Sequence, residues 1–104
     1  MIKVKVQMDQ GFITKMTIKG HAKSNEHGKD LVCAGVSSIC VGMLNALDKL
    51  CHDQFDCKYS DGYIQVETSS QTHDIQLLLK TLLIQLQTVE FVHKQFIKIT
   101  KQEV

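Results

Sequence analysis

Four cysteines and five histidines are the residues of this 104-residue sequence best suited to covalent chemistry. Two of them, His21 and Cys33, flank a polar stretch, residues 20–29, which reads Gly-His-Ala-Lys-Ser-Asn-Glu-His-Gly-Lys. A polar loop of about ten residues is long for a compact domain and is often functional. An imidazole within reach of a thiol could take its proton and later protonate a leaving amine. The pair is therefore a candidate nucleophile and general base.

The position of Cys33 at the start of an apolar segment favours this interpretation. Asp30 is a preferred N-cap residue, which would put Cys33 third in the first turn of a helix. A thiolate there would face the positive end of the helix dipole, and the unpaired N–H groups could stabilise an oxyanion. Asp30 could either disfavour the thiolate through its own charge or orient His21. Ser37 follows Cys33 by one turn, on the same helix face.

The other cysteines have simpler interpretations. A cysteine in an apolar helix is usually a small core residue, which is the alternative for Cys33 itself and the expectation for Cys40. Cys57 is expected on the inward face of a strand. Cys51 and His52 could join Cys57 in a metal site, but no fourth ligand is apparent and no Cys-x-x-Cys pair is present, so we expect no metal and no cofactor.

Charge and composition exclude several classes of protein. Lys and Arg total 12 against 11 for Asp and Glu, a net charge of +1 that argues against nucleic-acid and membrane-surface binding. The first eight residues lack the apolar run of a secretory signal, so we expect a cytoplasmic protein with reduced thiols. Residues 31–47 carry no charge, but a helix of that length spans about 25 Å, less than a bilayer core. A buried core helix is the better interpretation.

Two hairpins are predicted from alternating apolar residues. Residues 2–8 and 12–19 alternate around a turn at 9–11, which would place Val4 opposite Met16 with the apolar sets on one face. Asp61-Gly62 is a strong turn signal, and it places Tyr59 opposite Ile64, Cys57 opposite Val66 and Phe55 opposite Thr68.

The remaining segments predict two helices and a last strand. Residues 30 to about 51 are apolar nearly all round and are therefore expected to be buried. Apolar residues at helical spacing between Ile75 and Val89 predict a second helix, which Ser70 or Thr72 could cap and whose first turn would hold Asp74. Residues 96–101 predict a closing strand. The expected fold is a small single α+β domain, 1–104, in the order strand-strand-helix-strand-strand-helix-strand, with a mixed sheet packed with two helices.

Two sequence blocks resemble a known family. Gly20-His21-Ala22 and the block from Gly28 through Lys29, Asp30, Leu31, Val32, Cys33, Ala34, Gly35 and Val36 to Ser37 are similar to the signature of the ribosomal-processing cysteine protease (Prp) family. Length and element order also fit along the whole chain, and Gly35 stands where the family often has Ala.

The resemblance implies a bacterial, cytosolic endopeptidase that removes an N-terminal extension from large-subunit ribosomal protein twenty-seven. It implies Cys33 as nucleophile, His21 as general base, and Gly20, Asp30 and Ser37 as supporting residues. It further implies a homodimer, a loop at about 20–30 that is mobile until substrate binds, and a substrate with aromatic residues before the cut. The alternatives are a non-catalytic ribosome-associated assembly factor and, less favoured, a thiol-redox protein.

Overall fold

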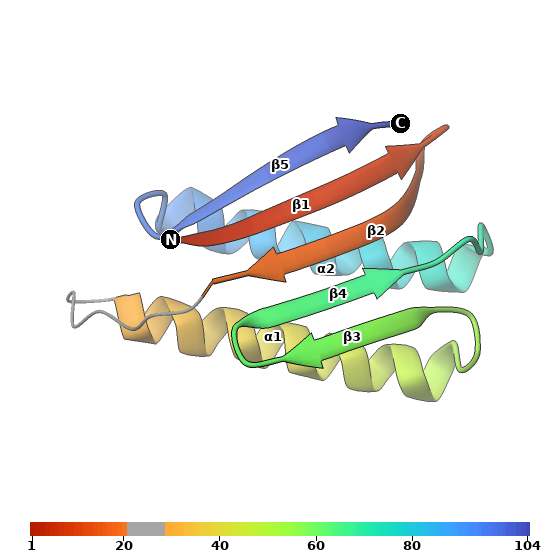
Figure 1. Ribbon diagram of the computed structural model, residues 1–104, viewed down its shortest axis with the longest axis horizontal. Helices are drawn as coiled ribbons and strands as arrows, with labels where there is room; N and C mark the ends of the chain where they lie inside the picture. Colours follow the sequence, from red (N-terminus) through yellow and green to blue (C-terminus); the bar gives the residue numbers. More distant parts are fainter. Residues whose placement is uncertain (21–28) are drawn as a thin grey trace.

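The computed structural model describes residues 1–20 and 29–104, with only the backbone described for Lys29 and Asp30. The predicted order of elements is confirmed (Figure 1). The elements are β1 (Ile2–Asp9), β2 (Phe12–Lys19), α1 (Lys29–Leu50), β3 (Asp56–Ser60), β4 (Tyr63–Glu67), α2 (His73–Val92) and β5 (Ile97–Glu103).

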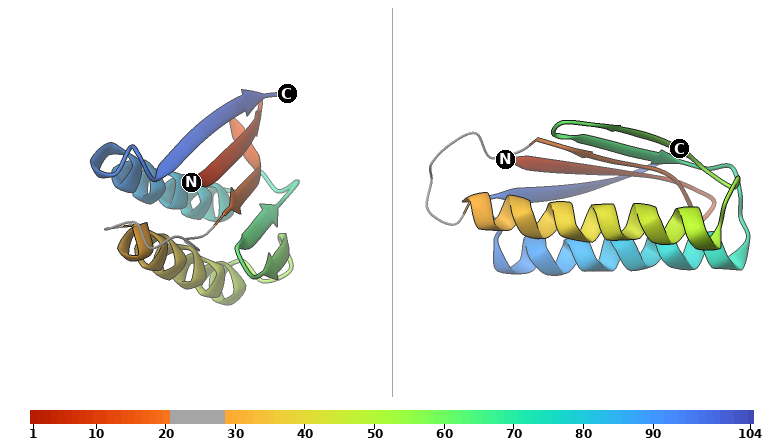
Figure 2. Two further views of the ribbon diagram at one scale, coloured as in Figure 1. Left: turned by 60° about the vertical axis from the view of Figure 1, so that its left-hand side comes forward. Right: turned by 90° about the horizontal axis from the view of Figure 1, so that it is seen from below.

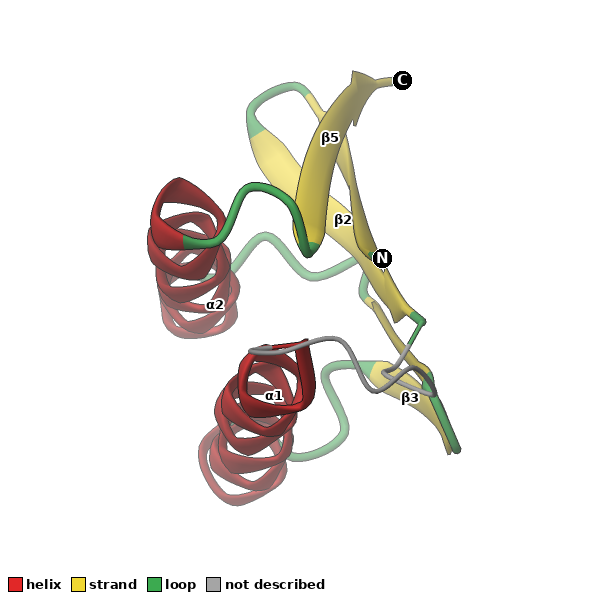
Figure 3. Cartoon of the chain, turned by 90° about the vertical axis from the view of Figure 1, so that its left-hand side faces the viewer, coloured by secondary structure: helices red, strands yellow, loops and turns green. Residues whose placement is uncertain are grey.

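The five strands form one mixed sheet in the order β3-β4-β2-β1-β5. β5 runs parallel to β1, and the other neighbouring strands are antiparallel. Both helices lie side by side on the same face of the sheet, and no described element covers the opposite face (Figures 2 and 3). The expected α+β class with a mixed sheet is confirmed, and the structure adds that the coverage is one-sided.

The first hairpin differs in register from the sequence prediction. Residues 10–11 form a two-residue turn in place of the predicted three-residue one, with φ of 51° and 84°. The register shifts again between Gln7 and Met8, where Thr14 of β2 is the extra residue. Val4 therefore pairs with Ile18 and not with Met16. The bulge inserts one residue, so it changes which side chains face the core beyond it. The predicted turn at 9–11 located the hairpin correctly, and the predicted pairing was wrong by two residues.

The second hairpin has the predicted register. Tyr59 pairs with Ile64 and Cys57 with Val66 across the Asp61-Gly62 turn, whereas Phe55 precedes β3. Cys57 shares the face of the buried Val66 but is exposed, because β3 is the edge strand and all five of its residues are exposed. Cys57 therefore lies on the inward face of its strand, as predicted, but this face is not covered at the edge of the sheet.

Helix α1 is buried on one side only, which corrects the prediction of a helix buried all round. Val36, Cys40 and Leu47 lie in the core, while Leu31 and Leu50 are 74% and 67% exposed. Both helices are long and apolar enough to cross a membrane. Their buried residues, however, form one core with the sheet, as core helices of a compact globule do.

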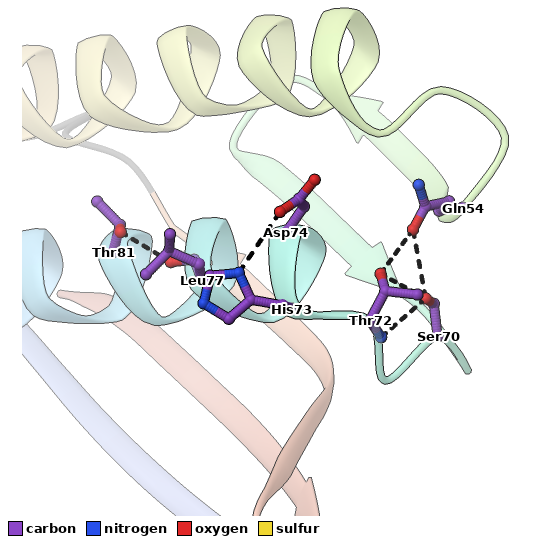
Figure 4. A network of polar contacts seen from close by, with 7 residues as sticks. All are labelled: Gln54, Ser70, Thr72, His73, Asp74, Leu77 and Thr81. Carbon is purple, nitrogen blue, oxygen red and sulfur yellow. Dashed lines mark hydrogen bonds and ion pairs between the residues drawn. The ribbon is translucent and has the colours of Figure 1, made fainter.

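Helix α2 begins after Thr72, one of the two predicted caps, and has Asp74 in its first turn. The Thr72 hydroxyl does not cap the helix; it donates to Gln54 Oε1 at 2.9 Å. The Ser70 hydroxyl lies 3.3 Å from the same oxygen and 3.1 Å from Thr72 Oγ1 (Figure 4). This polar network ties the start of α2 to the segment that precedes β3.

A buried glutamine joins α2 to the sheet. Gln76 accepts the Ile13 N–H with Oε1 and donates from Nε2 to the Ile13 carbonyl, both at 2.9 Å. Nε2 also donates to the Ser70 carbonyl at 3.0 Å. The side-chain amide thus pairs with strand β2 as a neighbouring strand would, so its burial leaves the polar atoms satisfied.

Candidate active site

A cavity of about 130 Å³ lies where the first half of α1 meets the β3–β4 turn and one end of the sheet. Helix α1 contributes Cys33, Ser37 and Cys40 to its wall, three residues at helical spacing. Gly20, at the end of β2, lines it as well. Three of the residues singled out in the sequence, Gly20, Cys33 and Ser37, therefore meet at one cavity.

Cys33 is half-buried and packs against the core. Helix α1 already includes Lys29, so Cys33 is its fifth residue and not its third. Asp30 consequently lies inside the first turn, and its predicted N-cap role was wrong. The unpaired N–H groups at the start of α1 precede Cys33, which lies about one turn further along the helix axis.

The remaining three thiols are poor nucleophiles. Burial raises the pKa of Cys40 to about 11. Burial and the neighbouring Asp74 carboxylate both raise the pKa of Cys51, and burial raises that of Cys57. A raised pKa keeps each of these three groups mainly as the thiol at neutral pH. Because the thiolate is the reactive form, this lowers their reactivity. All four cysteines are free and described, and Cys33 alone of them is half-buried at the cavity wall.

Gly20 holds the end of β2 against the turn of the second hairpin. Its N–H donates to the Gly62 carbonyl at 2.9 Å, and its φ of +105° favours glycine. A Cβ at this position would lie 2.7 Å from the Met1 carbonyl oxygen. The chain therefore leaves β2 at the cavity through a conformation that only glycine accepts without strain.

His21 is the next residue, and it lies outside the described residues together with the loop to residue 28. The Asp30 side chain is likewise outside them. The predicted general base and the role of Asp30 are therefore not placed by the structure.

The β3–β4 turn forms the wall opposite α1, which sequence reasoning missed. Tyr59, Asp61, Gly62 and Tyr63 all line the cavity. The sequence identified Asp61-Gly62 as a turn, but the signal for a turn is local and says nothing about the helix that faces it. The turn adds the aromatic side chain of Tyr59 and a carboxylate to the surroundings of Cys33, while the Tyr63 hydroxyl donates to Gln65 Oε1 at 2.7 Å on the other face of the sheet.

The alternative metal site is not assembled. Cys51 is buried and Cys57 is exposed on the edge strand, and His52 contacts Asp48 and Asp53 at 3.2 and 3.4 Å. Within residues 1–20 and 29–104, no group of three His, Cys, Asp or Glu side chains is positioned to hold a metal ion.

Comparison with known proteins gives consistent results. Residues 1–98 match the family described as cysteine protease Prp. The ribosomal processing cysteine protease Prp of Staphylococcus aureus is 35% identical over 94 residues, which cover 88% of this chain and 89% of the relative. The protein of the same name from Bacillus subtilis is 31% identical over 99 residues, covering 88% of each chain.

Solved structures agree with the sequence matches. Crystal structures of the Staphylococcus aureus protease Prp with a substrate peptide and with a covalently linked product peptide superimpose with TM-scores of 0.89 and 0.87. Both are 32% identical and cover 98% of this chain and 100% of their own.

Proposed function

Because this chain belongs to the Prp family of cysteine proteases, we propose that it is a cysteine endopeptidase with Cys33 as nucleophile and His21 as general base. The observation that carries the proposal is the position of Cys33, half-buried at the wall of a cavity that Gly20 also lines. His21 follows Gly20 directly in the sequence.

The reaction proceeds through an acyl-enzyme. His21 takes the thiol proton, and Cys33 Sγ attacks the carbonyl carbon of the scissile peptide bond. The resulting oxyanion is stabilised by backbone N–H groups at the start of α1. His21 then protonates the leaving amine, which departs as the C-terminal product. Water, deprotonated by His21, hydrolyses the thioester and releases the acid product and the thiol.

Asp30 and Ser37 act as positioning residues in this proposal. Ser37 lies one turn after Cys33 on the same cavity wall, where its exposed hydroxyl can hydrogen-bond to the substrate or the thiol. Asp30 lies in the first turn of α1. An orienting bond to His21 would stabilise the imidazolium that forms during attack.

We propose the N-terminal extension of large-subunit ribosomal protein twenty-seven as the substrate. The Staphylococcus aureus relative is a ribosomal processing cysteine protease, and its solved structures contain a substrate peptide or a covalently linked product peptide. The aromatic and apolar residues that line the cavity, among them Tyr59, Val36 and Ile64, suit an extension with aromatic residues before the cut.

We further propose that the enzyme works in the cytoplasm as a homodimer. A thiol nucleophile needs a reducing compartment to stay free. The solvent side of α2 carries Leu77, Ile84 and Phe91, which are 52%, 62% and 78% exposed. Their spacing of seven residues makes a straight apolar stripe of the kind that pairs two helices, so α2 is the proposed dimer surface.

The test is cleavage of a peptide that spans the proposed processing site, followed by mass spectrometry. We expect one cut with the native protein and none with Cys33→Ala or His21→Ala, while Cys57→Ala serves as the matched control and keeps full activity. Iodoacetamide should modify Cys33 well before the other three thiols. Full activity of Cys33→Ala would overturn the mechanism.

The assembly-factor alternative gives a different result in the same assay. The native protein would then leave the peptide and the intact ribosomal protein uncut, and the four thiols would react at rates set by exposure alone, with Cys57 first.

A further inference from the structure

The uncovered face of the sheet is rich in lysine. Strand alternation places the side chains that flank core residues on this face, opposite both helices (Figure 3). Six of the chain's basic residues lie there, here called the basic face: Lys3, Lys5, Lys15, Lys19, Lys58 and Lys98. Three carboxylates share this face: Asp9 and Asp56 lie near its ends, and Glu67 lies directly across from Lys15.

Part of the basic face is hollowed. A shallow concavity of about 480 Å³ is lined by Lys3, Lys5, Lys15 and Lys19, and the side chains between them are polar or aromatic. No carboxylate belongs to this lining. Four ammonium groups therefore surround one depression that is open to solvent.

The strand register places like charges opposite each other, which lowers the stability of the sheet. Lys3 pairs with Lys19 across β2 and with Lys98 across β5. Like charges directly opposite each other in a sheet destabilise it. In the described part of the chain, none of these lysines has a carboxylate oxygen within 4.0 Å. Glu67 lies opposite Lys15, whereas Lys3, Lys5, Lys19 and Lys98 have no carboxylate opposite them in the strand register. This positive charge is the arrangement expected of a surface that binds an anion.

From this charge complementarity we propose that the basic face binds the phosphate backbone of RNA. Phosphate groups along a strand neutralise several lysines at once, which a small anion cannot do. The concavity contains no large aliphatic side chain, so it lacks the apolar surface that would insert into a membrane. Tyr63, half-buried at its margin, offers a ring for base stacking.

The RNA we name is that of the ribosomal subunit, and this identification rests on the proposed function. Tyr63 lines both the concavity and the Cys33 cavity. The two sites lie on opposite faces of the sheet and meet at the β3–β4 turn, so RNA held on the basic face would reach the peptide site around that end of the sheet. The net charge of +1 predicted no nucleic-acid partner. That value adds positive and negative residues over the whole sequence, whereas the fold gathers six lysines on one face.

The test measures binding of a fluorescein-labelled single-stranded RNA of about 20 nucleotides by fluorescence anisotropy, between 50 and 200 mM KCl. The variant is Lys3→Gln with Lys5→Gln and Lys98→Gln. Its matched control, with the same change in net charge on the helical side, is Lys49→Gln with Lys80→Gln and Lys94→Gln. We expect the first variant to bind RNA about tenfold more weakly, and the slope of log affinity against log salt concentration to be smaller by about 2. The control should lose less than about threefold in affinity.

Three outcomes would overturn the proposal. These are no RNA binding by the native protein at 50 mM KCl, equal weakening by the two variants, or tighter binding to polyglutamate or to vesicles with 30% phosphatidylserine than to RNA. Peptide cleavage should be unchanged in both variants, and it is measured separately. Failure of the peptidase proposal would therefore appear in cleavage alone, and failure of the RNA proposal in anisotropy alone.

Discussion

The backbone N–H of Gly20 donates to the carbonyl oxygen of Gly62 at 2.9 Å. This bond joins the end of β2 to the turn between β3 and β4, two points more than forty residues apart in the chain. It closes one side of the cavity that Cys33 lines. The residue that precedes the proposed general base is thereby fixed to the wall opposite the proposed nucleophile.

Replacing Gly20 with alanine should impair both stability and catalysis. The new Cβ would meet the Met1 carbonyl oxygen at 2.7 Å, at a φ of +105°, so we expect a loss of about 2–4 kcal/mol in the free energy of unfolding. Displacement of His21 should lower kcat at least about tenfold. Urea denaturation and peptide cleavage measure the two effects.

Gly11→Ala is the matched control for this change. Gly11 also has a positive φ, +84°, but nothing lies within 4 Å of its Cβ position. We expect it to lose about 1 kcal/mol and to keep its kcat. Equal kcat values for the two variants would contradict a positioning role of Gly20.

Tyr59→Ala should weaken substrate binding without unfolding the protein. Tyr59 is 63% exposed and lines the cavity, so its removal should change stability by less than about 0.5 kcal/mol. Loss of the aromatic contact should raise KM by roughly tenfold, with kcat nearly unchanged. Lys58→Ala, on the opposite face of β3, is the control and should leave both constants as they are. A fall in kcat alone would show that Tyr59 is not a binding residue.

The buried Cys40 thiol should make stability fall at alkaline pH. Burial raises its pKa from 9.0 to about 11, so the folded protein holds this proton more tightly than the unfolded chain does. The stabilisation is complete below pH 9 and is lost as the pH rises toward 11, by about 3 kcal/mol in total. Urea denaturation between pH 8 and 11 should show this loss.

Cys40→Ala isolates that contribution, because the other titrating groups are common to both proteins. As the pH rises above 9, the free energy of unfolding of the variant should fall less steeply than that of the native protein. The stability of the variant relative to the native protein should therefore increase over this range. Parallel curves over this range would contradict the burial of an un-ionised Cys40.

Ile84→Glu should convert the proposed dimer to monomers. Ile84 is 62% exposed at the centre of the apolar stripe on α2, so a carboxylate there should weaken association at least about thirtyfold. Analytical ultracentrifugation measures the dissociation constant, and circular dichroism checks that the helix is retained. Gln85→Glu, on the neighbouring exposed position, should dimerise normally. Equal dissociation constants for the two variants would place the interface elsewhere.

Much of the fold could be predicted from the sequence, because the signals were local. The Asp61-Gly62 turn fixed the pairing of Tyr59 with Ile64, a long uncharged apolar segment located α1, and helical spacing located α2. The predicted pairing of the first hairpin was wrong because the turn has two residues instead of three and because Thr14 is an extra residue opposite Gln7 and Met8. Each shifts the pairing by one residue. Helix α1 was predicted to be buried all round because its composition is apolar, although its exposed side is rich in small residues.

For the candidate site, the sequence by itself determined the residue types and the element that carries each: a cysteine in the first turns of an apolar helix and a glycine–histidine pair after a strand. Only the tertiary structure decided that the β3–β4 turn faces Cys33, that Cys40 is held as a thiol, and that the basic face is uncovered. Turns, caps and periodicity are properties of neighbouring residues. Burial and the meeting of distant segments depend on how the helices and sheet pack, which no local pattern encodes.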